Sequence, residues 1–140
     1  MTILKGQGKA AQERFEEEAF VYIAASRQLE LIKIGFSKKS VHRADDLNRD
    51  GYGGASDWLI LYERRFKRAG WVESQAHTGL EAFRSRRTYT RLGHGISVTA
   101  KELFACNYAN SRAAVENMSD HSSGTRYERH DAKENFNFIR

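Results

Sequence analysis

The chain has 140 residues, of which 40% are hydrophobic and 29% are charged, and this balance predicts one compact domain with tails. No apolar run is long enough to cross a bilayer, and the first residues lack the apolar centre of a secretory signal. We therefore expect a soluble, cytoplasmic protein. The single cysteine, Cys106, excludes an internal disulfide, and we expect its thiol to be buried in the core.

The formal net charge is +5, and the cations are concentrated in two clusters. The clusters are Arg64, Arg65, Lys67 and Arg68, and then Arg84, Arg86, Arg87 and Arg91, which surround Tyr89. Clustered cations with an aromatic side chain nearby favour contacts with the phosphate backbone of a nucleic acid. A solvated surface that keeps the protein soluble explains the charges equally well.

The first half of the chain alternates strand-forming and helix-forming segments. Residues 1–18 are expected to be an N-terminal extension, with at most a short helix over 10–19. The segments 20–26 and 31–37 are rich in Val, Ile and Phe and are joined by a polar connection, which predicts a β-hairpin. Apolar residues then recur at helical spacing over 38–49, which predicts an amphipathic helix.

The middle of the chain continues this pattern before its composition changes. The apolar start of residues 57–66 predicts a third, central strand, and the helical period over 69–85 predicts the second main helix. Residues 84–100 have the composition of a basic loop with at most one short strand. Residues 101–106 are expected to form an edge strand.

The last part of the chain is the most polar. A short helix is predicted over 110–118, whereas 119–140 lacks a period until its closing apolar residues. We therefore expect a folded domain over 19–118, followed by a flexible polar tail. The strands and the helices that must cover them define a small α+β domain.

The predicted hairpin carries a recognisable pair of motifs. Residues 20–35 resemble the paired motif of the GIY-YIG nuclease superfamily, with Tyr22 of "FVY" in the first half and "KIG", Lys33 to Gly35, in the second. The "KIG" form resembles a divergent branch that is common in phage and mobile-element proteins, so the expected compartment is then the host cytoplasm. Two positions depart from the pattern, because Phe20 replaces the first glycine and Lys33 replaces the second tyrosine.

The resemblance continues into both predicted helices. Arg43 in "VHRADDLN" stands where the superfamily has an arginine, and Glu73 in "WVESQAHTGLEAF" stands where it has a glutamate. In the divergent branch a histidine follows one turn later, here His77, and an acidic-aromatic stretch like "KELF" comes after it. The resemblance implies a small α+β domain of the GIY-YIG type, with an antiparallel three-stranded sheet flanked by helices.

The function implied by the resemblance is that of an endonuclease that hydrolyses phosphodiester bonds, with DNA preferred over RNA as the expected substrate. Glu73 would be the metal ligand, because a carboxylate is a hard oxygen ligand for Mg²⁺ or Mn²⁺. A single protein carboxylate holds one ion weakly until substrate phosphate completes its coordination. Arg43 would pair with a phosphate, or, in the alternative, form a surface ion pair with a neighbouring carboxylate.

Three more side chains have roles that the residues alone leave open. Tyr22 could hold or deprotonate the attacking water, or could be a strand aromatic with its hydroxyl at the edge of the core. Lys33 could lower the pKa of Tyr22, act as the base itself, or contact a phosphate. His77 could orient substrate or shuttle a proton, or could be a half-buried histidine bonded to a carbonyl or carboxylate.

Two other functions compete with the endonuclease. One is a nucleic-acid-binding module of the same fold with little or no turnover, and the other is a small phage-type accessory protein that binds a protein partner through residues 119–140. The superfamily often has an asparagine late in the domain, and the candidates for it are Asn107, Asn110 and Asn117.

Overall fold

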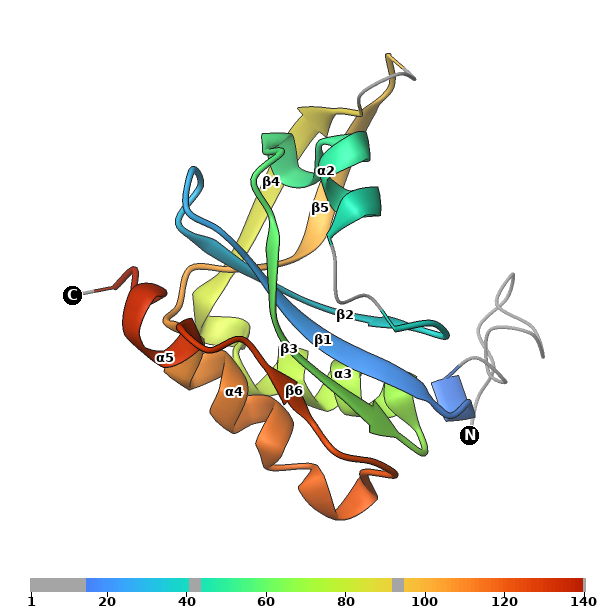
Figure 1. Cartoon of the computed structure of the whole chain (residues 1–140). Coiled ribbons are helices and arrows are strands. Elements are labelled where there is room, and N and C mark those ends of the chain that lie inside the picture. The colour runs from blue at the N-terminus through green and yellow to red at the C-terminus, as the bar shows by residue number, and fades with distance from the viewer. Residues whose placement is uncertain (1–14, 41–43, 92–94, 140) are drawn as a thin grey trace.

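The computed structural model describes residues 15–40, 44–91 and 95–139. This part of the chain is an α+β domain built on a six-stranded antiparallel sheet with the strand order β4-β5-β2-β1-β3-β6 (Figure 1). The expected α+β class is confirmed, but the expected three-stranded sheet is wrong. Strands β4 and β6 have few apolar side chains, and β5 was expected to be shorter and to lie at an edge.

The strands are β1 (Ala19–Ser26), β2 (Leu31–Ser37), β3 (Leu59–Phe66), β4 (Arg84–Thr90), β5 (Ser97–Phe104) and β6 (Tyr127–Glu128). The α-helices are α2 (Asp45–Asp50), α3 (Ala69–Gly79), α4 (Tyr108–Glu116) and α5 (Ala132–Asn135), and the 3-10 turns are η1 (Tyr52–Gly54), η2 (Glu81–Phe83) and η3 (Ser119–His121). The helix expected at 69–85 ends early, at Gly79. The helix expected at 38–49 is represented by α2, and residues 1–14, which hold the first half of the helix expected at 10–19, lie outside the described part of the chain.

The hairpin of β1 and β2 forms the centre of the sheet. Alternate side chains of a strand point to opposite faces, and here both faces are covered, which is why nearly every residue of β1 is buried. On one face Val21 and Ile23 pack with residues of α3 and α4, such as Val72 and Val115. On the other face the neighbouring residues pack in a second cluster, around Trp58.

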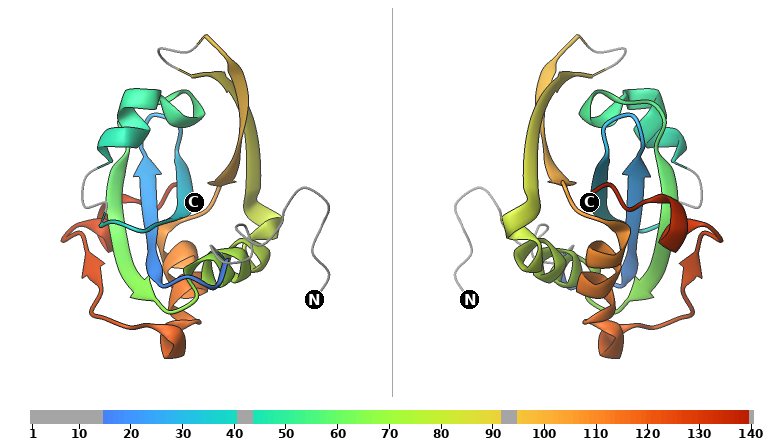
Figure 2. Two further views of the ribbon diagram at one scale, coloured as in Figure 1. Left: turned by 90° about the vertical axis from the view of Figure 1, so that its right-hand side faces the viewer. Right: turned by 90° about the vertical axis from the view of Figure 1, so that its left-hand side faces the viewer.

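The β4–β5 hairpin extends from the central strands as a curved arm, as the two views of Figure 2 show. Strand β4 covers residues 84–90 and is longer than the short strand that we expected within this loop, and β5 lies between β4 and β2 and not at an edge. Sequence periodicity missed β4 because most of its side chains are polar and exposed on the arm.

The junction between the arm and the central hairpin is short. β5 pairs with β2 at two positions, Ile32 with Phe104 and Lys33 with Leu103. Beyond these pairs the two strands diverge, and a wedge opens between them.

The segment after residue 118 packs against the domain, in contrast to the flexible tail that we expected. β6 pairs with β3, and the side chain of Phe136 is completely buried in the main core. The side chain of Asn107 binds the backbone of Ile139 twice, accepting from its N–H at 2.6 Å and donating to its carbonyl oxygen at 3.0 Å. The described part of this segment is therefore attached to the domain by strand pairing, by a buried side chain and by backbone hydrogen bonds.

None of the helices in the described ranges combines the length and the apolar character that a membrane span needs.

Candidate active site

The wedge between β2 and β5 is filled by side chains from α3. His77 Nε2 lies 2.9 Å from the carbonyl oxygen of Ile34, and the backbone N–H of Phe36 donates a hydrogen bond to the carboxylate of Glu73. Both backbone groups belong to the edge of β2 that β5 has left. The helix therefore completes the hydrogen bonding of this edge, and it brings two polar side chains, one turn apart, to the same place.

Lys33 and Tyr22 meet on the opposite face of the central hairpin. The ammonium nitrogen of Lys33 lies 2.6 Å from the hydroxyl oxygen of Tyr22, and both residues are buried, with exposures of 4% and 8%. Gly35 lies directly opposite Tyr22 in the register of β1 and β2. A Cβ atom at Gly35 would lie 2.5 Å from Lys33 Nζ and 2.6 Å from Tyr22 Oη, so the glycine leaves the space in which these two atoms meet.

A second tyrosine completes the surroundings of Lys33. The ammonium nitrogen lies 4.7 Å from the ring centroid of Tyr22 and 5.0 Å from that of Tyr52, which is the first residue of η1. Tyr52 Oη accepts a hydrogen bond from the backbone N–H of Glu102, and burial raises the pKa of Tyr52 to about 12. Sequence analysis gave Tyr52 no role, because it lies in a turn that carries no motif.

The charge on Lys33 is stabilised by its neighbours. Burial alone would lower the pKa of this amine, but the oxygen atoms of Tyr22 and Glu102 outweigh that effect and raise the pKa above its usual value. Glu102 Oε2 lies 3.5 Å from the ammonium nitrogen. This direction favours the charged ammonium form of Lys33, which suits a hydrogen-bond donor better than a general base.

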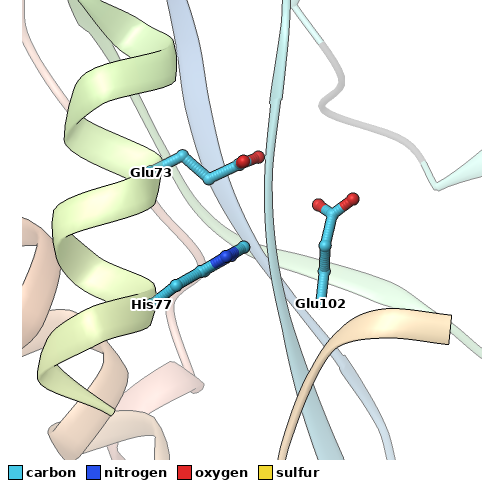
Figure 3. A group of neighbouring side chains, drawn as sticks. All are labelled: Glu73, His77 and Glu102. Carbon is cyan, nitrogen blue, oxygen red and sulfur yellow. The ribbon is translucent and has the colours of Figure 1, made fainter. Parts of the chain in front are cut away.

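Glu102 links this cation to the α3 side chains. One ligand atom from each of Glu73, His77 and Glu102 lies within 4.8 Å of the other two. Figure 3 shows Glu73 and His77 pointing from α3 towards β2, while Glu102 comes from the other side of the wedge. Sequence analysis cited the "KELF" stretch that contains Glu102 but assigned no role to it.

The two carboxyl groups of this cluster interact strongly. Burial and the neighbouring Glu102 raise the pKa of Glu73 to about 8, and a side-chain hydrogen bond with Glu102 contributes in the same direction. Burial and the closeness of Glu102 therefore favour a proton on Glu73 in the metal-free site. A divalent cation between the carboxylates would replace that proton and remove the repulsion.

This donor set fits Mg²⁺ or Mn²⁺. Carboxylate oxygens from Glu73 and Glu102 are the ligands that both ions prefer, and an imidazole nitrogen suits Mn²⁺ better than Mg²⁺. His77 already uses Nε2 as a donor to a carbonyl oxygen, so Nδ1 carries the lone pair of the neutral ring. Burial lowers the pKa of His77, which favours this neutral form.

A cleft of about 640 Å³ lies beside Tyr22, and its lining includes Phe36, Ser40, Ala44 and Ile60. Ser40 Oγ donates a hydrogen bond of 2.8 Å to the buried carboxylate of Glu63, which lies opposite Tyr22 on β3. The predicted Arg43 lies outside the described residues. Tyr22 is itself among the residues that line this cleft.

Most side chains of the two predicted basic clusters are already bound to other groups of the protein. Most of their members form ion pairs or bind backbone: Arg64 with Glu116, Arg65 with Glu18, Arg68 with Glu16, Arg84 with Glu81, Arg91 with Asp50, and Arg87 with the carbonyl oxygen of Gly53. The pair of Arg64 and Glu116 is the most enclosed of these ion pairs. Its N–O distance is 2.8 Å, and the side chains of Arg64 and Glu116 are 18% and 17% exposed. Within the described ranges, Lys67 and Arg86 are exposed and have no ion pair.

The late asparagines and the cysteine have structural surroundings. Asn107 and Asn110 form a capping box at the start of α4, and Asn117 ends that helix. None of the three is among the residues of the wedge that are described above. Cys106 is buried, as expected, and burial raises the pKa of its thiol to about 12.

Fold and site together define a small α+β domain in which a buried lysine–tyrosine pair and a carboxylate–histidine cluster meet where two strands diverge. A family model described as the T5orf172 domain matches residues 19–119. The chain therefore belongs to the T5orf172 domain family, a phage-associated domain related to nuclease-like folds. No curated protein and no solved structure matches the chain.

Proposed function

We propose that this chain is an endonuclease of the GIY-YIG type, which hydrolyses phosphodiester bonds of DNA with one Mg²⁺ or Mn²⁺ ion. The observation that carries the proposal is the 2.6 Å contact between Lys33 Nζ and Tyr22 Oη, beside the paired carboxyl groups of Glu73 and Glu102. Hydrolysis of a phosphodiester needs an activated water and positive charge near the transition state. This site offers a group for each need.

Tyr22 is the group that would accept the proton of the attacking water. A phenol with its ordinary pKa is a poor base at neutral pH, and a cation that donates a hydrogen bond to its oxygen stabilises the phenolate. Lys33 is placed to do so, because its ammonium can donate to Tyr22 Oη over 2.6 Å. The charged state of Lys33 favours this role over that of a base.

Glu73 and Glu102 would hold the ion, with His77 beside them. When bound, the ion would polarise a phosphate oxygen and offset the charge of the transition state. His77 is oriented by its bond to Ile34 and by the ring of Phe104, at a centroid distance of 5.1 Å. Arg43 is proposed, on the resemblance alone, to add positive charge to the phosphate.

The test is plasmid nicking with Mg²⁺ or Mn²⁺, comparing wild type with Glu73→Gln. We expect metal-dependent nicking that falls by at least about 100-fold in the variant. Glu134→Gln is the matched control, because Glu134 is exposed on α5 and belongs to no part of the site. Equal nicking by Glu73→Gln and wild type, or no nicking by folded wild type, would overturn the proposal.

One observation favours a second candidate, a nucleic-acid-binding module without turnover. Glu73 and His77 both bind backbone groups of β2, so they have a structural function even in the absence of chemistry. DNA binding by a folded protein that does not nick DNA under any metal condition would support this candidate. A protein partner for residues 119–140 stays a prediction without an observation that favours it.

A further inference from the structure

The arm formed by β4 and β5 has an unusual charge composition. Residues 84–101 contain five Lys and Arg residues and no Asp or Glu. The arm begins at the site, because Glu102 of the wedge is the next residue along β5. A surface without carboxylates beside a proposed phosphodiester site is a candidate for contact with the substrate backbone.

The two faces of the arm have different contacts. On the inner face, Arg87 Nε donates to the carbonyl oxygen of Gly53 at 3.0 Å, and the ring of Tyr89 lies 5.8 Å from that of Tyr52. The hydroxyl groups of Thr88 and Thr99 meet at 3.5 Å on the other face. We call this other side the outer face. By the alternation of side chains it comprises Thr88, Thr90, Ser97 and Thr99. Arg86 lies opposite Lys101 and Glu102, where the pairing of β4 and β5 is irregular, and both Arg86 and Lys101 are exposed.

The two cations of the outer face are available to a ligand. Among the described residues, neither Arg86 nor Lys101 has an ion pair, whereas Arg84 and Arg91 are paired with carboxylates. The four hydroxyl side chains between them can donate hydrogen bonds to phosphate oxygens. The outer face thus combines unpaired positive charge with neutral donors.

The inner side of the arm is less suitable for an anion. A cleft of about 270 Å³ separates the inner face from α2, and its lining includes the carboxylates of Asp46 and Asp50. Arg91 is already paired with Asp50 at 3.1 Å. Asp46 is likewise paired with Arg49, so the cations on this side are largely engaged, whereas the described cations of the outer face are not.

We infer that the outer face of the β4–β5 arm binds the phosphate backbone of duplex DNA next to the site, with Arg86 and Lys101 as its two charged contacts. This inference rests on the proposed function and extends it, because it selects these two cations from the basic residues of the chain. It also predicts binding without sequence preference, since phosphate contacts carry no base information.

The experiment measures the affinity of the full chain for a mixed-sequence DNA duplex over a range of salt concentrations, without divalent metal so that no cleavage occurs. In the double variant Arg86→Gln/Lys101→Gln, the slope of log K against log salt should fall by about one for each lost contact. The matched control is Lys67→Gln, which removes an exposed, unpaired cation from the turn between β3 and α3, and its slope should equal that of wild type.

A second variant gives an independent readout. Thr88→Glu adds a negative charge to an exposed residue of the outer face, and should weaken DNA binding while the unfolding temperature stays unchanged. Equal salt slopes for the double variant and wild type would overturn the inference, and metal-dependent nicking could still support the proposed function. If folded wild type neither binds nor cleaves DNA, both proposals are wrong.

Discussion

The ammonium group of Lys33 donates a hydrogen bond to the hydroxyl oxygen of Tyr22 in the space that Gly35 leaves free. The two atoms are 2.6 Å apart, and Gly35 lies beneath them, directly opposite Tyr22. This geometry explains the glycine of the "KIG" motif by a steric requirement. It also places the cation of Lys33 directly on the hydroxyl oxygen of Tyr22.

Replacing Lys33 by Met should abolish the proposed activity while retaining the fold. Methionine fills a similar volume but cannot donate to Tyr22, so the phenolate would lose its stabilising cation. We expect a fall in nicking rate of at least about 100-fold. The unfolding temperature should change little, because removal of a buried charge offsets the lost contacts. Nicking by Lys33→Met at the wild-type rate would contradict the role given to this cation.

Gly35→Ala should disturb the site directly. The new methyl group would meet Lys33 Nζ and Tyr22 Oη at distances far below van der Waals contact, so both side chains would have to move. Overpacking of this kind destabilises by about 1–3 kcal/mol, measurable by urea unfolding, and activity should fall together with stability.

Gly79→Ala is the matched control for that substitution. A Cβ at Gly79 has no atom within 4 Å, and the residue lies at the end of α3. Alanine should therefore stabilise the helix by about 0.5–1 kcal/mol and leave nicking unchanged. Equal effects of the two glycine substitutions would show that the space at Gly35 has no special function.

The stability of the metal-free protein should fall as the pH rises from about 5 to above 8. The pKa of Glu73 is raised in the folded state to about 8 from its usual value of 4.5, so the folded protein binds more protons than the unfolded chain in this range. Deprotonation therefore favours unfolding. Thermal melts at several pH values should show the decline, and Glu73→Gln should flatten it. A flat wild-type profile would contradict the raised pKa of Glu73.

Added Mg²⁺ or Mn²⁺ should reverse the decline. An ion that binds the ionised carboxylates competes with protons, so its effect on the unfolding temperature should increase with pH. The control is a buffer without divalent cations, brought to the same ionic strength with NaCl. A shift of the same size at pH 5 and pH 8.5 would show that the ion acts elsewhere.

Phe136→Ala should strongly destabilise the domain, although residue 136 lies beyond the range that the family model matches. The phenylalanine is completely buried, and such truncations cost about 3–5 kcal/mol. Phe138→Ala should cost less, because Phe138 is only partly buried against the same core. Urea unfolding measures both. Equal, small effects would indicate that this segment is not part of the cooperative unit.

Local motifs predicted which elements carry the candidate site residues, whereas they did not predict the sheet. Short motifs placed Tyr22 and Lys33 on paired strands and Glu73 and His77 on one helix, and the structure brings these residues to the same part of the fold. Local spacing is sufficient for such pairs. Glu102 was not predicted as a member, because its place depends on how β5 leaves β2, which is a long-range pairing without a local signal.

The missed strands have a related cause. β4 lies on an arm that is solvated on one face, so its side chains show no apolar alternation. β6 has two residues and is held by contacts made far away in the chain. The terminal segment is polar apart from a few aromatic residues, and one of these, Phe136, is sufficient to anchor it in the core.

The absent side chain at Gly35 also affects the entropy of the site. A free lysine side chain loses about 2 kcal/mol of rotamer entropy when it is fixed in one conformation. In this fold the hollow above Gly35 and the rings of Tyr22 and Tyr52 confine Lys33 before any substrate arrives. The entropy cost of ordering Lys33 is therefore part of the free energy of folding and not of substrate binding. An incoming phosphate meets a cation that is already in position.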